Sequence, residues 1–214
     1  MSTGLYGILT QQAIKGNIEC MLYYLPVSPY RPAIDPQRRQ YQNPEDILAK
    51  IGLTSGMTFI DVGCGGGFFA MPAARIVGNT GKVIGFDVNI EGLEALKELA
   101  AKEGLYHVDV AAGSAEETVL CEKCADIIFF GLVVVHLQEP VKALVNAGKM
   151  LKTGGRAVVF DWKKKLTRQG PPMEQRLSEK QVTGFIEAAG MKPISVGETG
   201  PYHYVITAEV LKCS

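Results

Sequence analysis

The sequence has no excess charge of either sign and no long apolar run. Lys and Arg together number 22, and Asp and Glu also number 22, so the formal net charge at pH 7 is zero. A chain without an overall positive field has no general attraction for nucleic acid or for anionic membranes. No stretch of about 18 apolar residues is present, which predicts no membrane insertion. These absences disfavour nucleic acid and lipid as the main partners.

The sequence also lacks a secretory signal and an even set of cysteines. Residues 1–16 contain no basic start followed by a purely apolar run. The cysteines are Cys20, Cys64, Cys121, Cys124 and Cys213. Their odd number and wide scatter predict reduced thiols in a cytoplasmic protein. Cys121 and Cys124 form a CxxC pair, but no second pair is spaced to complete a zinc site, so we expect no metal and inert thiols.

From about residue 43 onwards, strand-like and helix-like segments alternate. Strands are expected at residues 57–62, 82–88, 106–112, 125–132 and 156–162, and helices at residues 43–53, 68–78, 89–104, 139–151 and 178–190. Asn43, Asn89 and Ser178 are the expected N-caps. Two closing β-rich runs, 191–197 and 202–212, predict an antiparallel hairpin. The alternation predicts an α/β fold, with a doubly wound, mostly parallel sheet and helices on both faces.

The first expected strand ends in a glycine-rich turn, DVGCGGG at residues 61–67. Ligands of doubly wound sheets bind at the carboxyl ends of the strands. A dinucleotide fingerprint would require glycine at position 68, where Phe68 stands. Asp61 would repel a pyrophosphate but would favour a ligand that carries an ammonium and a sulfonium. Asp87, at the end of the second strand, can bind a ribose diol in a nicotinamide cofactor or in S-adenosylmethionine.

The glycine turn, together with FDV at residues 86–88, resembles the class I S-adenosylmethionine-dependent methyltransferases. The resemblance continues through ADIIFFGLVVVHLQEP at 125–140 and KMLKTGGRAVVFDW at 149–162. These stretches look like the strand-four and strand-five blocks of the small-molecule branch that includes ubiquinone/menaquinone-type methyltransferases. The resemblance implies a seven-stranded sheet of order 3-2-1-4-5-7-6 whose last strand is antiparallel. It also implies S-adenosylmethionine as cofactor and an unidentified small molecule as methyl acceptor.

The resemblance further implies which residues hold the cofactor. Asp61 and the glycine turn would line its methionyl end, Asp87 would bind the ribose hydroxyls, and Val88 would stack beside the adenine. The other expected cofactor-binding residues belong to the turn or follow the third and fourth strands: Gly63, Cys64, Gly65, Gly67, Ser114, Ala115, Gly131 and Leu132.

His136 and Asp161 follow the fourth and fifth strands and are the candidate catalytic residues. Either could serve as a general base if the acceptor must lose a proton. Alternatively, His136 caps the next helix and Asp161 binds loop backbone. Tyr202 and His203 fall in the closing hairpin and are expected to be partly exposed. A basic stretch, Lys163 to Lys165 with Arg168 nearby, is either a solvated loop or a patch that attracts an anionic substrate.

Residues 1–42 match no block of the family. Their apolar residues approximate helical spacing, which predicts an N-terminal helical lid ahead of a cofactor-binding domain at residues 43–214. Packing against the core and pairing in a homodimer are the alternatives. Arg31, Arg38 and Arg39, in this segment, either face an anionic acceptor or, as is usual for arginines, lie at the surface.

Three other functions stay open. The first is methylation of RNA or protein, although no Asn/Asp-Pro-Pro-aromatic motif follows the fourth strand. The second is a binding protein that keeps the cofactor pocket without turnover. The third is a nicotinamide oxidoreductase. Against it, this sequence contains no Tyr-x-x-x-Lys pair typical of short-chain dehydrogenases, and its length leaves no room for a second catalytic domain.

Overall fold

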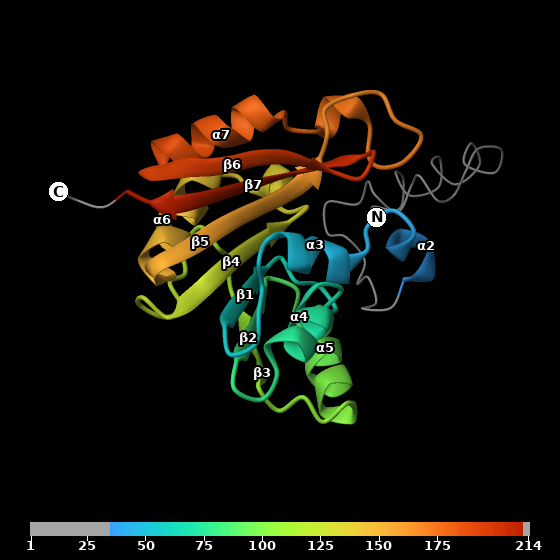
Figure 1. The fold of residues 1–214 in the computed structure, drawn as a ribbon, viewed down its shortest axis with the longest axis vertical. Helices are drawn as coiled ribbons and strands as arrows, with labels where there is room; N and C mark the ends of the chain where they lie inside the picture. The colour runs from blue at the N-terminus through green and yellow to red at the C-terminus, as the bar shows by residue number, and fades with distance from the viewer. Residues whose placement is uncertain (1–34, 212–214) are drawn as a thin grey trace, which may run out of the picture.

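A computed structural model describes residues 35–211, which form a sheet of strand order β3-β2-β1-β4-β5-β7-β6 (Figure 1). The strands are β1 (Thr58–Val62), β2 (Lys82–Asp87), β3 (Val108–Ala112), β4 (Ala125–Gly131), β5 (Leu151–Trp162), β6 (Met191–Thr199) and β7 (His203–Val210). The first five strands are parallel, whereas β7 is antiparallel to both β5 and β6. The predicted fold class and strand order are therefore confirmed.

Helices cover both faces of this sheet. They are α3 (Pro44–Lys50), α4 (Ala70–Val77) and α5 (Ile90–Lys102) on one face, and α6 (Pro140–Met150) and α7 (Glu179–Ala188) on the other (Figure 1). The predicted caps are present. The Asn43 and Asn89 side chains accept backbone N–H groups of the first turn, and Ser178 forms a capping box with Gln181. Each cap satisfies N–H groups that have no partner within the helix, so local sequence sets where these helices begin.

The predicted N-terminal lid is described only from residue 35 onwards, and residues 1–34 lie outside the described part of the chain. Its described part contains the short helix α2 (Pro36–Arg39), which begins where the Asp35 side chain accepts the Arg38 N–H at 2.9 Å. The extent of the lid and its boundary at residue 42 stay predictions.

The core lies on both faces, because the central strands are buried on both sides. Phe129 on β4 belongs to the cluster under α3, α4 and α5, while its neighbour Phe130 belongs to the cluster under α6 and α7. The Phe129 ring contacts Phe59, Phe69 and Phe160 at centroid distances of 5.8, 4.8 and 6.3 Å. These rings join β1, β4 and β5 to the start of α4. They hold the central strands against one another and against the start of α4.

The strand β5 begins earlier than the sequence predicted. It starts at Leu151 rather than at Arg156, and its pairing with β4 shifts register between Ala125 and Ile127. Gly155 permits this extension, because a side chain there would stand 2.8 Å from the Ala125 carbonyl oxygen. Close backbone approach of this kind leaves no mark in the periodicity of a sequence.

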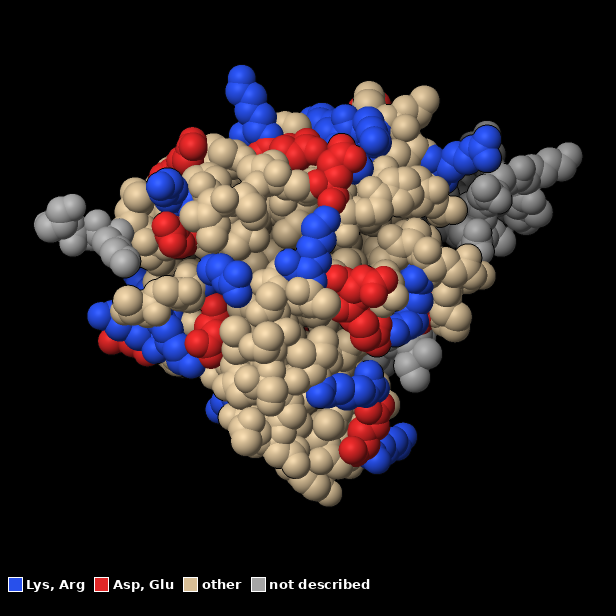
Figure 2. Space-filling view, viewed as in Figure 1, with Lys and Arg blue, Asp and Glu red and all other residues tan. Residues whose placement is uncertain are grey.

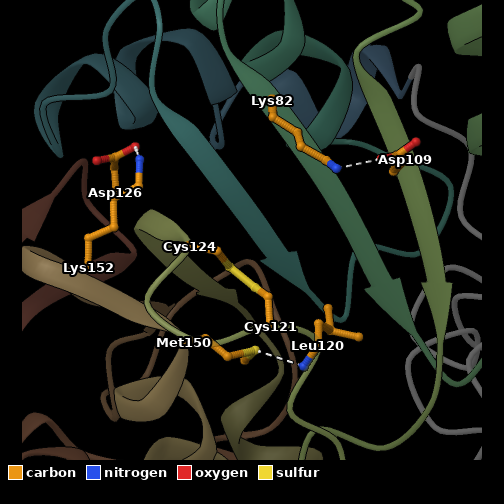
Figure 3. Close-up of a disulfide and its surroundings, with 8 residues drawn as sticks. All are labelled: Lys82, Asp109, Leu120, Cys121, Cys124, Asp126, Met150 and Lys152. Carbon is orange, nitrogen blue, oxygen red and sulfur yellow. Dashed lines mark hydrogen bonds and ion pairs between the residues drawn. A yellow bond between two sulfur atoms is a disulfide. The ribbon is translucent and has the colours of Figure 1, made fainter.

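The prediction of free thiols at Cys121 and Cys124 is wrong, because the two sulfur atoms are bonded (Figure 3). The connection between β3 and β4 turns tightly there and brings the two Cα atoms to 6.0 Å, a distance suited to a disulfide. Backbone bonds anchor the turn, with the Lys123 N–H donating to the Lys149 carbonyl and the Cys124 N–H to that of Met150. As predicted, the pair precedes β4, at the opposite end from the strand's carboxyl terminus.

Two further observations concern the whole described part of the chain. No helix within residues 35–211 is long and apolar enough to cross a membrane. In the same residues, no group of three or more His, Cys, Asp or Glu side chains is placed to hold a metal ion.

We expect Phe129→Ala to lower the free energy of unfolding by roughly 3–5 kcal/mol, because the ring is fully buried among three others and its removal leaves a cavity. Urea unfolding followed by circular dichroism measures this loss. Tyr106→Ala is the control, since Tyr106 is 85% exposed and should change stability little. Equal effects of the two substitutions would contradict the described core.

Candidate functional site

The glycine turn lies at the carboxyl end of β1, where the ends of β2 and β4 also lie. The Gly63 N–H donates to the Phe86 carbonyl at 2.7 Å, which holds the turn against β2. Gly67 has φ of 93°, and a side chain there would stand 2.5 Å from Leu96. Gly65 has φ of 51°, but a side chain there would meet no heavy atom within 4 Å among the described residues. The turn is thus packed from behind and open at Gly65, where a ligand can approach the backbone.

The carboxylate of Asp87 joins the ends of β1 and β2. One oxygen accepts the Gly65 N–H at 2.7 Å and the other accepts the Asn89 N–H at 2.9 Å. Two bonds from one side chain therefore fix both the glycine turn and the start of α5. The next residue, Val88, is 70% exposed, so an apolar surface stands beside this carboxylate.

Asp61 is buried beneath the turn, with 2% of its surface exposed. Its Oδ2 has no hydrogen-bond partner among the described residues. Burial first, and then the charge of Asp87, raise the pKa of Asp61 to about 8, while the Arg38 guanidinium and the Ala70 N–H oppose this shift. Buried carboxylate oxygens are normally paired, so an unpartnered one indicates a place for a donor or a cation from a ligand.

Arg38 and His203 lie deeper than the sequence predicted. Arg38 is 8% and His203 is 1% exposed. The Arg38 guanidinium lies 3.7 Å from the centre of the Phe68 ring, and its Nε donates to Gln42 Oε1 at 2.5 Å. Both were expected at or near the surface, and they are buried because α2 packs against the ligand edge of the sheet.

Gln42 continues this chain of bonds to His203, with its Nε2 2.7 Å from His203 Nε2. Because Arg38 can only donate, the Gln42 carbonyl oxygen accepts and its amide group donates, so His203 Nε2 must accept. His203 is therefore neutral, with its proton on Nδ1. Burial and the nearby charges of Arg38, Arg176 and Lys163 lower its pKa to about 3, which agrees with this assignment. No sequence signal marks Gln42, whose importance depends on a contact 161 residues away.

The two candidate catalytic residues lie in different environments. His136 is exposed, at the end of the short turn η2 (Val134–His136) after β4. Asp161 is 2% exposed at the end of β5. Its Oδ1 accepts the Trp162 N–H at 2.7 Å, while its Oδ2 has no partner among the described residues. Burial raises the pKa of Asp161 to about 7, against the opposing effects of the Trp162 N–H and Arg176.

The remaining predicted cofactor residues surround the same edge. Ser114 donates to Glu116 at 2.9 Å, and the Ala115 carbonyl accepts from Asn146, so the loop after β3 is held in place. Leu132, after Gly131 at the end of β4, has φ of 63°, an uncommon conformation for a residue with a side chain. Such backbone strain is often found at binding sites.

Cys64 lies within the turn and is 7% exposed. Burial, together with the charges of Asp61 and Asp87, raises the pKa of its thiol well above the usual range. A thiol that stays protonated is a poor nucleophile, so Cys64 contributes packing to the site rather than reactivity.

Comparisons with known proteins agree with this geometry. The family described as "methyltransferase domain" matches residues 53–192. A solved structure of an S-adenosylmethionine-dependent methyltransferase from Aquifex aeolicus is 34% identical, with a TM-score of 0.78 over 83% of this chain and 94% of that one. The chain belongs to the class I S-adenosylmethionine-dependent methyltransferase family. The strand order of the sheet is the one that the family resemblance implied.

Curated members of the methyltransferase family are more distant. The demethylmenaquinone methyltransferase of Oceanobacillus iheyensis is 26% identical over 117 residues, which are 55% of this chain and 49% of that protein. The arsenite methyltransferase of Halobacterium salinarum is 26% identical over 148 residues, which are 69% of this chain and 36% of that protein. The chain therefore aligns with half or less of the length of these two relatives.

The site fits the cofactor of the methyltransferase family. S-adenosylmethionine carries an ammonium and a sulfonium, which suit the unpartnered oxygen of Asp61. Its ribose and adenine suit the carboxylate of Asp87 and the exposed side chain of Val88. The open side of Gly65 provides space for a ligand next to the backbone.

We expect Asp61→Asn to gain stability relative to the parent between pH 5 and pH 8, by up to about 4 kcal/mol over these three pH units. The folded pKa of about 8 exceeds the ordinary 3.8, so the folded state binds the extra proton between these values. Stability of the parent protein must then fall as pH rises through this range, and the variant removes that fall. Urea unfolding at both pH values measures it. Asp109→Asn, an exposed carboxylate on β3, is the control, and parallel pH dependence of Asp61→Asn and the parent would contradict the assignment.

Proposed function

We propose that the protein transfers a methyl group from S-adenosylmethionine to a small molecule. The observation that carries this proposal is the buried carboxylate of Asp61, whose Oδ2 has no partner among the described residues, beneath a turn that is open at Gly65. Once ionised, this carboxylate stabilises a cationic ligand and repels a pyrophosphate, so a bound cation favours its charged form and lowers its raised pKa. The site is thus better suited to a sulfonium cofactor than to a dinucleotide.

In this proposal, different residues at the carboxyl ends of the strands bind different parts of the cofactor. Asp61 and the turn residues Gly63, Cys64, Gly65 and Gly67 hold the methionyl end of the cofactor. Asp87 binds the ribose hydroxyls, and the adenine lies between Val88 and the loop of Ser114 and Ala115. Gly131 and Leu132 form the floor near the transferred methyl group.

Bound S-adenosylmethionine supplies an electrophilic methyl group on a good leaving group. The protein then has to align the acceptor, exclude water and, where the acceptor is an acid, remove its proton. We propose Asp161 as the base, because a pKa of about 7 leaves its carboxylate partly ionised at neutral pH and able to accept a proton. His203 is unsuited, since its Nε2 is engaged by Gln42 and its pKa is about 3. The exposed His136 is the second candidate base.

The features of the site indicate the chemical class of the methyl acceptor and not its identity. A small molecule with an ionisable proton suits Asp161, whereas RNA and protein acceptors lack a specific observation in their favour. The proposal retains the cytoplasmic location expected from the sequence, and the homodimer stays a prediction.

Calorimetry with S-adenosylmethionine, its demethylated product S-adenosylhomocysteine, and NAD tests the proposal. We expect binding of the first two and not of NAD. A screen of cell extract with a methyl-labelled donor then identifies the acceptor. Binding of NAD alone would overturn the proposed function, and cofactor binding without labelling of any molecule would favour a non-catalytic binding protein.

We expect Asp87→Ala to weaken binding of S-adenosylmethionine by roughly 1–3 kcal/mol, because charged hydrogen bonds to the ribose are lost. Calorimetry measures the change in affinity. Asp87 also accepts two backbone N–H groups, so circular dichroism must first show that the variant folds. Asp109→Ala, which removes an exposed carboxylate from the neighbouring strand, should bind like the parent. Unchanged affinity in folded Asp87→Ala would remove this residue from the site.

We expect Asp161→Asn to lower kcat by roughly 10²–10⁴-fold without changing the affinity for S-adenosylmethionine, because the amide cannot accept the acceptor's proton. With the acceptor found in the screen, kcat of the parent should rise with pH through about 7 as the carboxylate ionises. That rise should be absent in the variant. A variant that keeps the rise would point to His136 or to an acceptor that needs no base.

A further inference from the structure

The loop that joins β5 to α7, residues 163–178, carries exposed basic and apolar side chains at the ligand edge of the sheet. Leu166 is 90% exposed, the largest exposure of the apolar side chains at the described surface. Lys164 and Lys165 precede it and Arg168 follows it, and all three are exposed. Basic side chains are visible in Figure 2 at the upper right of the molecule, where this loop lies in Figure 1.

This loop has a defined structure that holds Leu166 outward. Arg176, which is 3% exposed, donates to the backbone carbonyls of Lys163, Lys165, Gln169 and Pro171 at 2.8–3.0 Å. Gly170 packs directly on the Trp162 ring, where a side chain would stand 2.6 Å away. A buried guanidinium with four carbonyl partners fixes both arms of the loop. The exposure of Leu166 is therefore a property of an ordered loop.

Basic side chains outnumber acidic ones on this loop, although Glu198 lies close to Lys165 and Glu174 is exposed later in the loop. Residues 163–170 contain no acid, so Lys164, Lys165 and Arg168 form a local positive patch although the net charge of the chain is zero. Lys163 does not contribute, because its side chain is 3% exposed and forms an ion pair with Glu198. Cations alone would suit any phosphate. An apolar side chain among them, fully in solvent, suits a surface where phosphates border hydrocarbon.

We propose that the 163–178 loop docks onto the surface of an anionic lipid bilayer. Leu166 enters the boundary between headgroups and acyl chains, and Lys164, Lys165 and Arg168 contact the phosphate headgroups. The binding is peripheral, since no helix within residues 35–211 is long and apolar enough to cross the membrane. Because the loop follows β5 at the ligand edge, docking turns the candidate site toward the bilayer. Taken with the proposed function, on which this step rests, it identifies the acceptor as a molecule that partitions into lipid.

Vesicle sedimentation with the full chain tests the proposal. We expect binding to vesicles of phosphatidylcholine and phosphatidylglycerol, little binding to phosphatidylcholine alone, and weaker binding at high salt. Leu166→Ser should lower the partition coefficient roughly tenfold, through loss of apolar burial. Lys164→Gln combined with Lys165→Gln should lower it roughly twenty-fivefold, about fivefold for each charge.

Matched variants control for surface changes elsewhere. Lys97→Gln with Lys102→Gln removes two exposed charges from α5, and Val196→Ser removes an apolar side chain that is 55% exposed on β6. Both should bind vesicles like the parent. All four variants change exposed side chains, so thermal unfolding should show that each is folded.

Three outcomes overturn the docking proposal. The first is equal binding to both kinds of vesicle. The second is vesicle binding that neither loop variant reduces. The third is an RNA oligonucleotide that binds the parent and Leu166→Ser equally but not the Lys164/Lys165 variant, which would assign the patch to nucleic acid. Calorimetry of the parent with S-adenosylmethionine distinguishes the two proposals, because absence of cofactor binding would end the proposed function and leave the vesicle result standing.

Discussion

The carboxylate of Asp87 is the contact on which the geometry of the candidate site depends. It accepts one N–H from the glycine turn after β1 and one from the start of α5, so a single side chain sets two loops at once. The same charge lies close enough to Asp61 to help raise its pKa. A side chain that organises the turn therefore also makes the buried carboxylate beneath it harder to ionise. A bound cation would offset this repulsion between Asp61 and Asp87, so the pair suits a ligand that carries positive charge.

At the ligand edge of the sheet, few ionisable groups gain or lose a proton near neutral pH. The Arg38–Gln42–His203 chain keeps the imidazole neutral, and burial keeps the Cys64 thiol protonated. Asp61 and Asp161 are the two buried carboxyls whose pKa values lie near neutrality. Unpartnered buried oxygens destabilise a folded protein, and proteins retain them mainly where binding or catalysis requires them. The two unpartnered oxygens therefore lower the free energy of unfolding at the same positions that the proposed activity requires.

Local features of the sequence predicted much of the fold. Asn43, Asn89 and Ser178 were recognisable as caps because a cap acts within three or four residues of its own position. The glycine turn and Asp87 were recognisable because their spacing belongs to one βαβ unit. The strand order came from the family resemblance, since strand pairing across the sheet leaves no local signal.

Other features depend on contacts between distant segments and could not be predicted. Arg38 was expected at the surface because arginines usually lie there, yet α2 buries it against Phe68. The disulfide between Cys121 and Cys124 depends on how tightly the chain turns before β4. The unpartnered oxygen of Asp161 reflects what surrounds the end of β5, which no spacing in the sequence records. The sequence named Asp161 as a candidate, and only the structure shows why its chemistry is unusual.

The connection between β3 and β4, residues 113–124, forms no helix, and this has a consequence for the dynamics of the sheet. The helices α6 and α7 cover the other strands of that face, whereas a groove of about 320 Å³ lies beside Ile84, Ala111 and Leu120. Amide groups of a sheet exchange with solvent first where fewest apolar contacts must open. Hydrogen exchange should therefore reach β3 before β4 and β5. The β3 edge of the sheet then opens locally more often than the central strands. The strands that carry the proposed catalytic residue Asp161 and the glycine turn remain protected from exchange.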